Sequence, residues 1–431
     1  MKKIYISFCL IIVSYGTFAQ LDLKACLAMA DTANLTIRNA ELDIEINKRE
    51  RSSYLSSRLP QLEFNADYKY NAIIQGQVVP AAFFGGESGS YATVQFGVPY
   101  VLSNNIQLTQ ILFNSQLNYG LAALKINADI VETQRNITIQ EIRYQVSNSY
   151  FLLQGLEKQL AFLERNLSQT LKLLKNVNGL VEKGLALQLE ADKIKINLLN
   201  IENGISMAKS SKEQLTDLLK ILIGYPKDKT LTLIEDSMIE QSLIKSNETK
   251  QFYALRLIES QQAMNKEESK GIKMSYLPNL NFYSIYNYSY NINPGDNFRK
   301  GIDGVFLGLR FDWRLFDGMQ RSYKSKMNAI RTGKLANQYE IANQQLEMAA
   351  NQAKRQIKLK SEALNLAKEQ LALAENVFEQ TSLKFEKGLI NTTELTLTEN
   401  SLYQAQNNIV TNYIQLRQAE LDYLKSIGNI K

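Results

Sequence analysis

Apolar residues recur along this chain with two different periods, and the periods divide it into helical and strand-forming segments. Residues 115–178 and 318–382 carry apolar side chains at alternating steps of three and four positions. A seven-residue repeat of this kind predicts helices that pack together as coiled coils. The second seam runs from Leu346 to Phe378 with one polar break, at Lys360. The first seam consists of Ile142, Val146, Ser149, Leu153, Leu156, Leu160, Leu163, Leu167, Thr170 and Leu174.

Shorter helical patterns cover residues 34–58, 187–222, 252–276 and 392–427. All six prolines lie outside the predicted helices. Uninterrupted helices require this, because an interior proline costs ~3 kcal/mol or more. In each half of the chain the two shorter helices together match the length of the long one. We therefore expect the short helices to stack end to end beside each long helix.

Between the helices the apolar period changes to two, which predicts β-strands over residues 62–75, 91–110, 280–292 and 303–314. Each segment is at least as long as the ~9–11 residues with which a strand crosses a membrane. One face is rich in apolar and aromatic side chains that we expect to contact lipid: Tyr68, Tyr70, Tyr286, Tyr288, Phe311 and Trp313. The other face carries charges that we expect in a wet barrel lumen: Asp67, Lys69, Arg310 and Asp312.

Arg310 determines which face of the last strand meets lipid. An arginine that faced lipid at mid-membrane would cost ~2–4 kcal/mol, so its neighbours Leu309 and Phe311 must face outward instead. The alternative interpretation is a water-soluble antiparallel sheet with one buried face. The presence of four such strands, all rich in apolar and aromatic residues, favours membrane-spanning strands over a water-soluble sheet.

The whole order of segments occurs twice. Leu59-Pro60-Gln61-Leu62 opens the first pair of strands, and Leu277-Pro278-Asn279-Leu280 opens the second. Leu112-Phe113-Asn114 and Leu315-Phe316-Asp317 close them. Residues 20–224 and 251–431 are therefore two copies of helix, strand, strand, long helix, turn and helix, joined by residues 225–250. The first copy has an extra loop that includes residues 80–86.

Each copy has a Glu-Lys-Gly-Leu turn between its long helix and its returning helix. The turns lie within residues 181–185 and 385–389. Glycine is the usual residue just past a helix C-terminus, because it adopts the left-handed conformation at no steric cost. We therefore expect Gly184-Leu185 and Gly388-Leu389 to form the tips of two long helical hairpins.

Four strands cannot close a barrel, and a sheet edge cannot remain unpaired in lipid. Several chains must therefore contribute strands. Two chains would give eight strands around an interior filled by side chains, whereas three would give twelve around an open lumen. A trimer would also supply enough helices to continue the barrel as a tube.

Composition removes most other classes of function. The 431 residues include no histidine, the commonest general base and a common metal ligand. We find no catalytic constellation and no Gly-rich phosphate loop, so we expect no enzyme activity, cofactor or metal. The net charge of +6 is modest and no dense basic cluster is present, which argues against nucleic acid.

Residues 1–19 have the features of a secretory signal peptide: Lys2 and Lys3, a short apolar run, and a small-x-small site at 17–19. The apolar run is too short for a membrane-spanning helix. Removal of the signal would leave Cys26 as the only cysteine. Residues 23–26 faintly resemble a lipoprotein processing site, but Asp22 and Lys24 interrupt its apolar lead-in. A buried thiol is therefore favoured over lipidation.

In this order, and repeated, the motifs resemble the TolC family of outer-membrane efflux and secretion channels over essentially the whole mature chain. Where the family often has proline before Leu-Phe, this chain has Ile111 and Arg314. The resemblance rests on Leu21–Cys26, both Leu-Pro-x-Leu segments, Gln110–Asn114, Leu315–Gly318, both Gly-Leu turns, Ile223-Gly224 and Ile427-Gly428.

The resemblance implies an α+β membrane protein. Three identical chains would form a 12-stranded β-barrel in the outer membrane of a Gram-negative bacterium and a coiled-coil α-helical tunnel in the periplasm. The tips would meet a periplasmic adaptor, or membrane fusion protein, coupled to an inner-membrane transporter. The chain would be the exit duct of a tripartite efflux or type I secretion system. Residues 225–250, with Leu231 and Leu233, would form the equatorial segment around the tunnel.

The family often places acidic residues after the second tip, where they narrow the periplasmic mouth. Glu394 matches the first such position, Leu397 occupies the second, and Glu190 is the counterpart of Glu394 in the first copy. A trimer would hold a ring of three Glu394 carboxylates that favours cations. The spacing of Asn391 and Glu394 also fits a helix capping box, and the two roles are compatible. If the mouth opens, the unequal residues after the two tips predict that the second hairpin moves.

The alternative function is a periplasmic coiled-coil adaptor or structural protein without its own pore. This alternative accounts for the helical hairpins. It does not account for two aromatic pairs of strands placed between helices.

Overall fold

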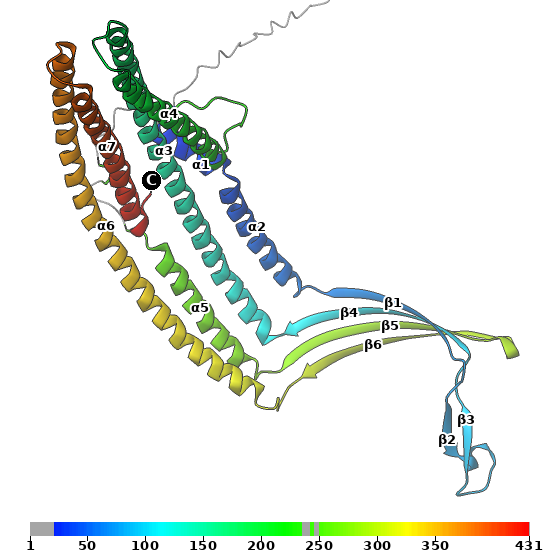
Figure 1. Ribbon diagram of the computed structural model, residues 1–431. Helices are drawn as coiled ribbons and strands as arrows, with labels where there is room; N and C mark the ends of the chain where they lie inside the picture. Colours follow the sequence, from blue (N-terminus) through cyan, green and yellow to red (C-terminus); the bar gives the residue numbers. More distant parts are fainter. Residues whose placement is uncertain (1–20, 235–241, 245–249, 431) are drawn as a thin grey trace, which may run out of the picture. The chain divides into compact units, whose positions relative to one another are not determined.

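The computed structural model describes residues 21–234, 242–244 and 250–430. The predicted signal peptide and residues 235–241 and 245–249 of the linker lie outside the described residues. In chain order the elements are α1 Leu23–Ala33, α2 Leu35–Ser56, β1 Gln61–Tyr70, β2 Gly76–Pro80, η1 Ala81–Phe84, β3 Tyr91–Gln95, β4 Tyr100–Phe113, α3 Ser115–Glu182, α4 Gln188–Ile223, α5 Tyr253–Met274, β5 Asn279–Asn293, η2 Pro294–Asp296, β6 Phe298–Asp312, α6 Gln320–Glu386 and α7 Thr392–Ser426 (Figure 1).

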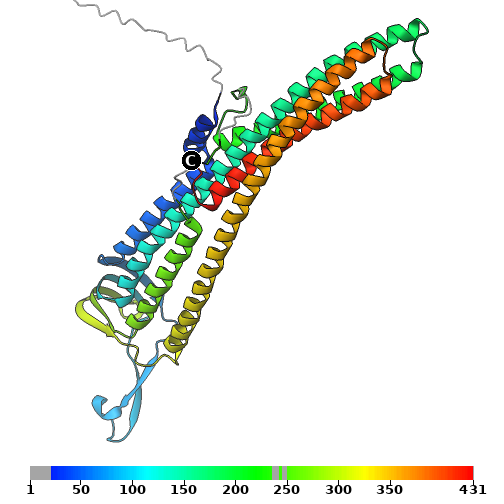
Figure 2. The same cartoon turned by 90° about the vertical axis from the view of Figure 1, so that its left-hand side faces the viewer.

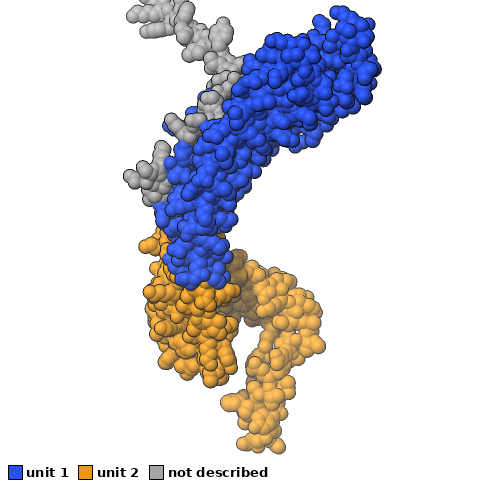
Figure 3. Space-filling model, turned by 60° about the vertical axis from the view of Figure 1, so that its left-hand side comes forward, with its two compact units in different colours: residues 1–43, 132–257, 338–431 blue, residues 44–131, 258–337 orange. Residues whose placement is uncertain are grey.

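The chain forms two compact units that do not coincide with its two sequence copies (Figure 3). Unit 1 comprises the described residues up to 43 together with 132–257 and 338–430. Unit 2 comprises residues 44–131 and 258–337. Each unit therefore takes part of both copies, and α2, α3, α5 and α6 each continue from one unit into the other.

Unit 1 contains the two helical hairpins, α3 with α4 and α6 with α7, lying side by side (Figure 2). The predicted heptad positions provide much of the core: Val146 and Leu153 of α3 are almost fully buried, as are Ala405 and Leu402 of α7. The polar break at Lys360 is accommodated by a hydrogen bond of 2.7 Å from its Nζ to Oε1 of Gln415. The coiled-coil pattern therefore identified the surfaces along which these helices pack.

The helix α1 was not predicted, because its eleven residues are too few for a heptad pattern. Asp22 caps its first turn, accepting the N–H of Ala25 at 2.7 Å. Cys26 is fully buried in the core of unit 1, and burial raises the pKa of its thiol to about 11. The linker contributes to the same core through Leu233, which pairs with Leu21 in an isolated parallel bridge. This environment fits a structural thiol.

Unit 2 contains an antiparallel sheet of four strands in the order β1-β4-β5-β6. Directly opposite residues in antiparallel strands project to the same face. Tyr68 lies opposite Leu102, which lies opposite Tyr290. On the other face Asp67 lies opposite Ser103, which lies opposite Ser289. The pairing register thus keeps these predicted apolar and polar positions on opposite faces across β1, β4 and β5.

Two strand predictions were wrong in extent. The strand predicted over 62–75 ends at Tyr70, and the strand predicted over 91–110 is divided into β3 and β4. Gly97, at φ +154°, and Pro99 separate β3 from β4. Proline has no N–H for the sheet, and the glycine adopts a backbone conformation that other residues rarely take. The strands β2 and β3 pair only with each other, as a separate hairpin.

Candidate functional sites

The two Gly-Leu tips have the same local geometry. The N–H of Gly184 donates to Val181 O at 2.9 Å and that of Leu185 to Leu180 O at 2.8 Å. The N–H groups of Gly388 and Leu389 make the equivalent bonds, each at 2.9 Å, to Phe385 O and Lys384 O. Both glycines have φ of +71°, and this pattern is the Schellman motif that ends helices. The leucine side chains are 73% and 69% exposed, so each tip presents an apolar group outward.

The helices that follow the two tips begin differently. Asn391 caps α7, its Oδ1 accepting the N–H of Glu394 at 2.9 Å, whereas Leu187 before α4 supplies no side-chain cap. This bond is one half of the capping box expected from the sequence. Glu394 is exposed, while Glu190 is half-buried and accepts a hydrogen bond of 3.2 Å from Lys193. The two acidic positions therefore have different surroundings.

A buried carboxylate joins the two hairpins. Glu399 of α7 is 3% exposed and accepts hydrogen bonds from three neutral donors. Thr170 Oγ1 and Tyr403 Oη donate to Oε1 at 2.6 and 2.5 Å, and Asn197 Nδ2 donates to Oε2 at 2.8 Å. Burial and the nearby carboxylate raise the pKa of the Tyr403 hydroxyl. Residues from α3, α4 and α7 thus meet at one charged group in the core.

Two further polar pairs lie along the same interface between α3 and α7. Gln406 Oε1 accepts from Asn166 Nδ2 at 2.7 Å, and Tyr413 Oη donates to Gln154 Oε1 at 3.1 Å. Glu399, Gln406 and Tyr413 are spaced by seven residues, so they form a polar row within the apolar seam. Sequence reasoning missed this row, although its heptad spacing was a usable signal. The row specifies the register between the two hairpins, because each polar group needs its partner.

We predict that Glu399→Ala destabilises the folded helices by at least about 2 kcal/mol, because the buried Thr170 and the partly buried Tyr403 and Asn197 lose their acceptor. Glu399→Gln keeps one acceptor oxygen and is expected to lose less. Thermal unfolding of the detergent-solubilised protein, followed by circular dichroism, measures both. Asn400→Ala, at the adjacent exposed position, is the control; equal midpoints for the two alanine variants would contradict the prediction.

The register of the sheet assigns every predicted barrel residue that lies in a strand to a face. Phe311 pairs with Leu280 on the apolar face, and Arg310 pairs with Asn281 on the polar face. Trp313 lies just beyond β6, where its indole Nε1 donates to Tyr276 O at 3.0 Å. The other members of the apolar face are Tyr68, Tyr70, Tyr286 and Tyr288, and those of the polar face are Asp67, Lys69 and Asp312.

The turn from β6 into α6 is held by one arginine. Arg321 Nε donates to Asp317 Oδ2 at 2.7 Å; Arg321 is buried and Asp317 is partly buried. Its remaining guanidinium nitrogens donate to Ser275 O and Arg314 O, at 3.1 and 2.9 Å. The guanidinium also lies over the ring of Tyr276 at 4.1 Å. The sheet exit, the end of α5 and the start of α6 therefore share one anchor.

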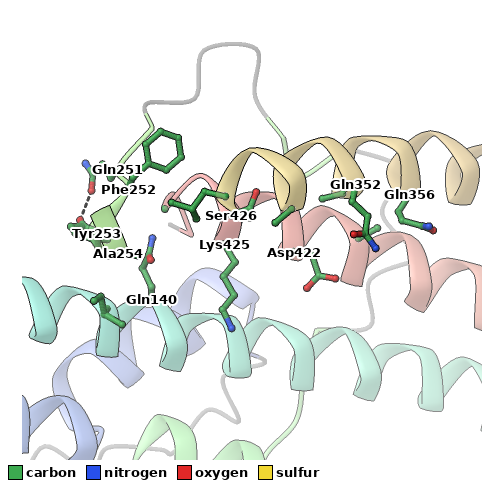
Figure 4. A pocket seen from close by; sticks show the side chains of 16 residues that line it. Gln140, Gln251, Phe252, Tyr253, Ala254, Gln352, Gln356, Asp422, Lys425 and Ser426 are labelled. Carbon is green, nitrogen blue, oxygen red and sulfur yellow. Dashed lines mark hydrogen bonds between the residues drawn. The ribbon is translucent and has the colours of Figure 1, made fainter. Parts of the chain in front are cut away.

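A cavity of about 510 Å³ lies in unit 1 among α3, α6, the end of α7 and the start of α5 (Figure 4). Glutamines 140, 251, 352 and 356 and several alanines line it. Asp422 of its lining accepts from Tyr144 Oη at 2.8 Å, and burial together with this bond raises the pKa of Tyr144 to about 12. Lys425 lies 2.8 Å from Glu141, and this bond lowers the pKa of the Glu141 carboxyl. The cavity therefore offers mainly amides and small apolar groups.

Within the described ranges, no group of three or more His, Cys, Asp or Glu side chains could hold a metal ion. The helices that the structure describes include none that is both long and apolar enough to span a membrane.

Long helical hairpins with equivalent Gly-Leu tips, joined to a four-stranded sheet, are the features of the TolC-like architecture expected from the sequence. Residues 273–429 match the family model described as outer membrane efflux protein. No curated protein sequence gives a significant match to the chain. The sequence match therefore supports the TolC-like resemblance over residues 273–429, which include β5, β6, α6 and α7.

Solved structures share the fold across nearly the whole chain. CusC is 15% identical with a TM-score of 0.75, covering 96% of this chain and 93% of its own. The open-state MtrE channel of Neisseria gonorrhoeae is 16% identical with a TM-score of 0.72, covering 94% and 89%. VceC of Vibrio cholerae is 13% identical with a TM-score of 0.70, covering 94% and 96%. The predicted combination of long helical hairpins and a sheet is confirmed.

Proposed function

We propose that the protein is the exit duct of a tripartite efflux or secretion system and works as a homotrimer. In this proposal, three sheets close a 12-stranded barrel. The helices continue the barrel toward a periplasmic adaptor and an inner-membrane transporter, whose selectivity would set the substrate. The observation that carries the proposal is the two-faced sheet with free edges at β1 and β6.

The unpaired edges of β1 and β6 indicate that the sheet is completed by strands of other chains. Every residue of β1 is exposed, and most residues of β6 are exposed as well. An unpaired strand edge is not tolerated in lipid, because its backbone groups would lack hydrogen-bond partners. Pairing β1 of one chain with β6 of the next satisfies both edges. Three chains give twelve strands, a number that leaves room for a lumen.

The tips are proposed to contact the adaptor. They are the two places where the chain repeats an exposed Gly-Leu turn with the same hydrogen bonds. Three chains would present six such turns around one mouth. An adaptor with matching apolar pockets would bury Leu185 and Leu389.

The rival function is a periplasmic adaptor or structural protein without a pore. Membrane fractionation after mild and detergent extraction separates the two. The exit duct is expected in the outer-membrane fraction, released only by detergent, as a trimer that dissociates on heating. Recovery as a soluble periplasmic monomer would exclude the exit duct and favour the rival.

Glu394 is proposed to line the periplasmic mouth as a ring of three carboxylates. We predict that Glu394→Gln lowers cation over anion selectivity in single-channel recordings, because the ring loses its charge. The side chain still permits the cap by Asn391, whose acceptor binds the backbone N–H. Asn391→Ala is the matched variant, expected to weaken the helix start by about 1 kcal/mol without changing selectivity. Unchanged selectivity in Glu394→Gln would leave only the helix-start role.

A further inference from the structure

The β2–β3 hairpin exposes apolar side chains and has little core of its own. Within unit 2 it turns away from the four-stranded sheet (Figure 1). Its largest exposed side chains are Ile73, Val78, Phe83, Phe84, Tyr91 and Phe96, with Phe83 80% exposed. A two-stranded hairpin standing alone in water is marginally stable at best. Several large apolar side chains exposed on one small hairpin point to an interaction surface.

The base of the hairpin is tied firmly to the end of the sheet. Asn71 N–H donates to Pro99 O at 2.7 Å, and Asn71 Nδ2 donates to Val98 O at 2.9 Å. The second sequence copy has no such extension, because its strands β5 and β6 are joined directly through η2. The hairpin therefore marks one side of the sheet end that lies away from the helices, next to the edge strand β1.

The charge pattern distinguishes two possible binding partners of this surface, anionic lipid headgroups and a second copy of the hairpin. Glu87 is the single charged residue from Tyr70 to Tyr100, and the sequence has no lysine or arginine between Lys69 and Lys125. A surface that binds anionic lipid headgroups needs such basic residues. A second copy of the same nearly uncharged, aromatic surface has no charge conflict to overcome. Closed rotational symmetry would also bring equivalent hairpins around one axis.

We propose that the β2–β3 hairpins of neighbouring chains pack against one another through Phe83 and Phe84 and form an apolar constriction at the outer mouth. This inference rests on the proposed trimer. The hairpin is inserted between β1 and β4, so each chain of that trimer would present one hairpin at the same end of the barrel. An apolar constriction can block water and ions by dewetting. The channel would then have a second barrier at the end opposite its periplasmic tips.

Disulfide crosslinking in intact cells tests the contact. Phe83→Cys is made in a Cys26→Ala background, so that the introduced thiol is unique once the predicted signal peptide with Cys9 is removed. Mild oxidation is expected to link chains through residue 83 at least about ten times more than through Asp296→Cys, because a disulfide requires Cα atoms within ~7 Å. Asp296 lies in η2 at the same end of the sheet and is the matched control.

Permeability provides a second, independent measurement. Phe83→Ser with Phe84→Ser is expected to raise sensitivity to vancomycin, a large hydrophilic antibiotic, by several-fold and to increase single-channel open time. Intact outer-membrane trimers with no excess crosslinking of Phe83→Cys over Asp296→Cys would overturn the hairpin contact alone. Absence of any trimer would instead overturn the proposed function. If the serine variant does not reach the membrane, the crosslinking result still decides.

Discussion

Replacement of Leu185 and Leu389 together with aspartate is expected to abolish efflux and to leave the proposed outer-membrane trimer intact. Both side chains lie at exposed turns, so the substitutions disturb no core. In the proposed contact each aspartate would enter an apolar adaptor pocket as an unpaired charge. Burial of an uncompensated charge costs about 3–5 kcal/mol, which corresponds to a loss of more than a hundredfold in affinity for each tip.

Drug or dye export by cells carrying the complete system measures this effect, and heat-modifiable bands on gels report the trimer. The conservative pair Leu185→Met with Leu389→Met is the control, since methionine retains an apolar side chain of similar volume. Normal export by the aspartate variant would show that Leu185 and Leu389 do not contact the adaptor. Loss of the trimer would show instead that the turns serve assembly.

Leu307→Arg is expected to prevent barrel formation, whereas Phe306→Arg, one residue earlier, is expected to permit it. Leu307 lies opposite Ser284 on the apolar face, and Phe306 lies opposite Ile285 on the other. Both side chains are large and exposed in the single chain, at 70% and 58%. An arginine on the lipid face near mid-membrane costs ~2–4 kcal/mol, and a trimer would contain three such residues. An arginine in the lumen can remain hydrated.

The amounts of trimer extracted from outer membranes measure the difference between these two variants. If the sheet were water-soluble with one buried face, neither position would meet lipid, and the cost of a lipid-facing arginine side chain would not apply to either variant. Equal trimer yields from the two variants would contradict the assignment of the faces. Reversed yields would mean that the two faces are interchanged.

The sequence predicted the periodic elements well and the irregular ones poorly. The seam of Val146 and Leu153 could be found because burial along a helix repeats every few residues. The division of the strand around Pro99 was missed, because alternation of apolar residues continues from β3 into β4 although the hydrogen bonding does not. The cluster around Glu399 was missed because its donors come from three helices far apart in sequence. The heptad spacing within α7 marks the polar row, but it cannot show which side chains of α3 and α4 meet Glu399.

The free edges of β1 and β6 also bear on how the protein matures. Contacts within the helical hairpins are local or connect neighbouring helices, and such contacts form quickly. Edge pairing between chains depends on encounters and therefore on concentration. A newly exported chain would pass through a state with formed helices and unpaired aromatic strands, which is prone to aggregate. If the proposed trimer forms, the stability of the sheet is a property of the assembled protein, and its folding depends on the rate at which chains reach the membrane.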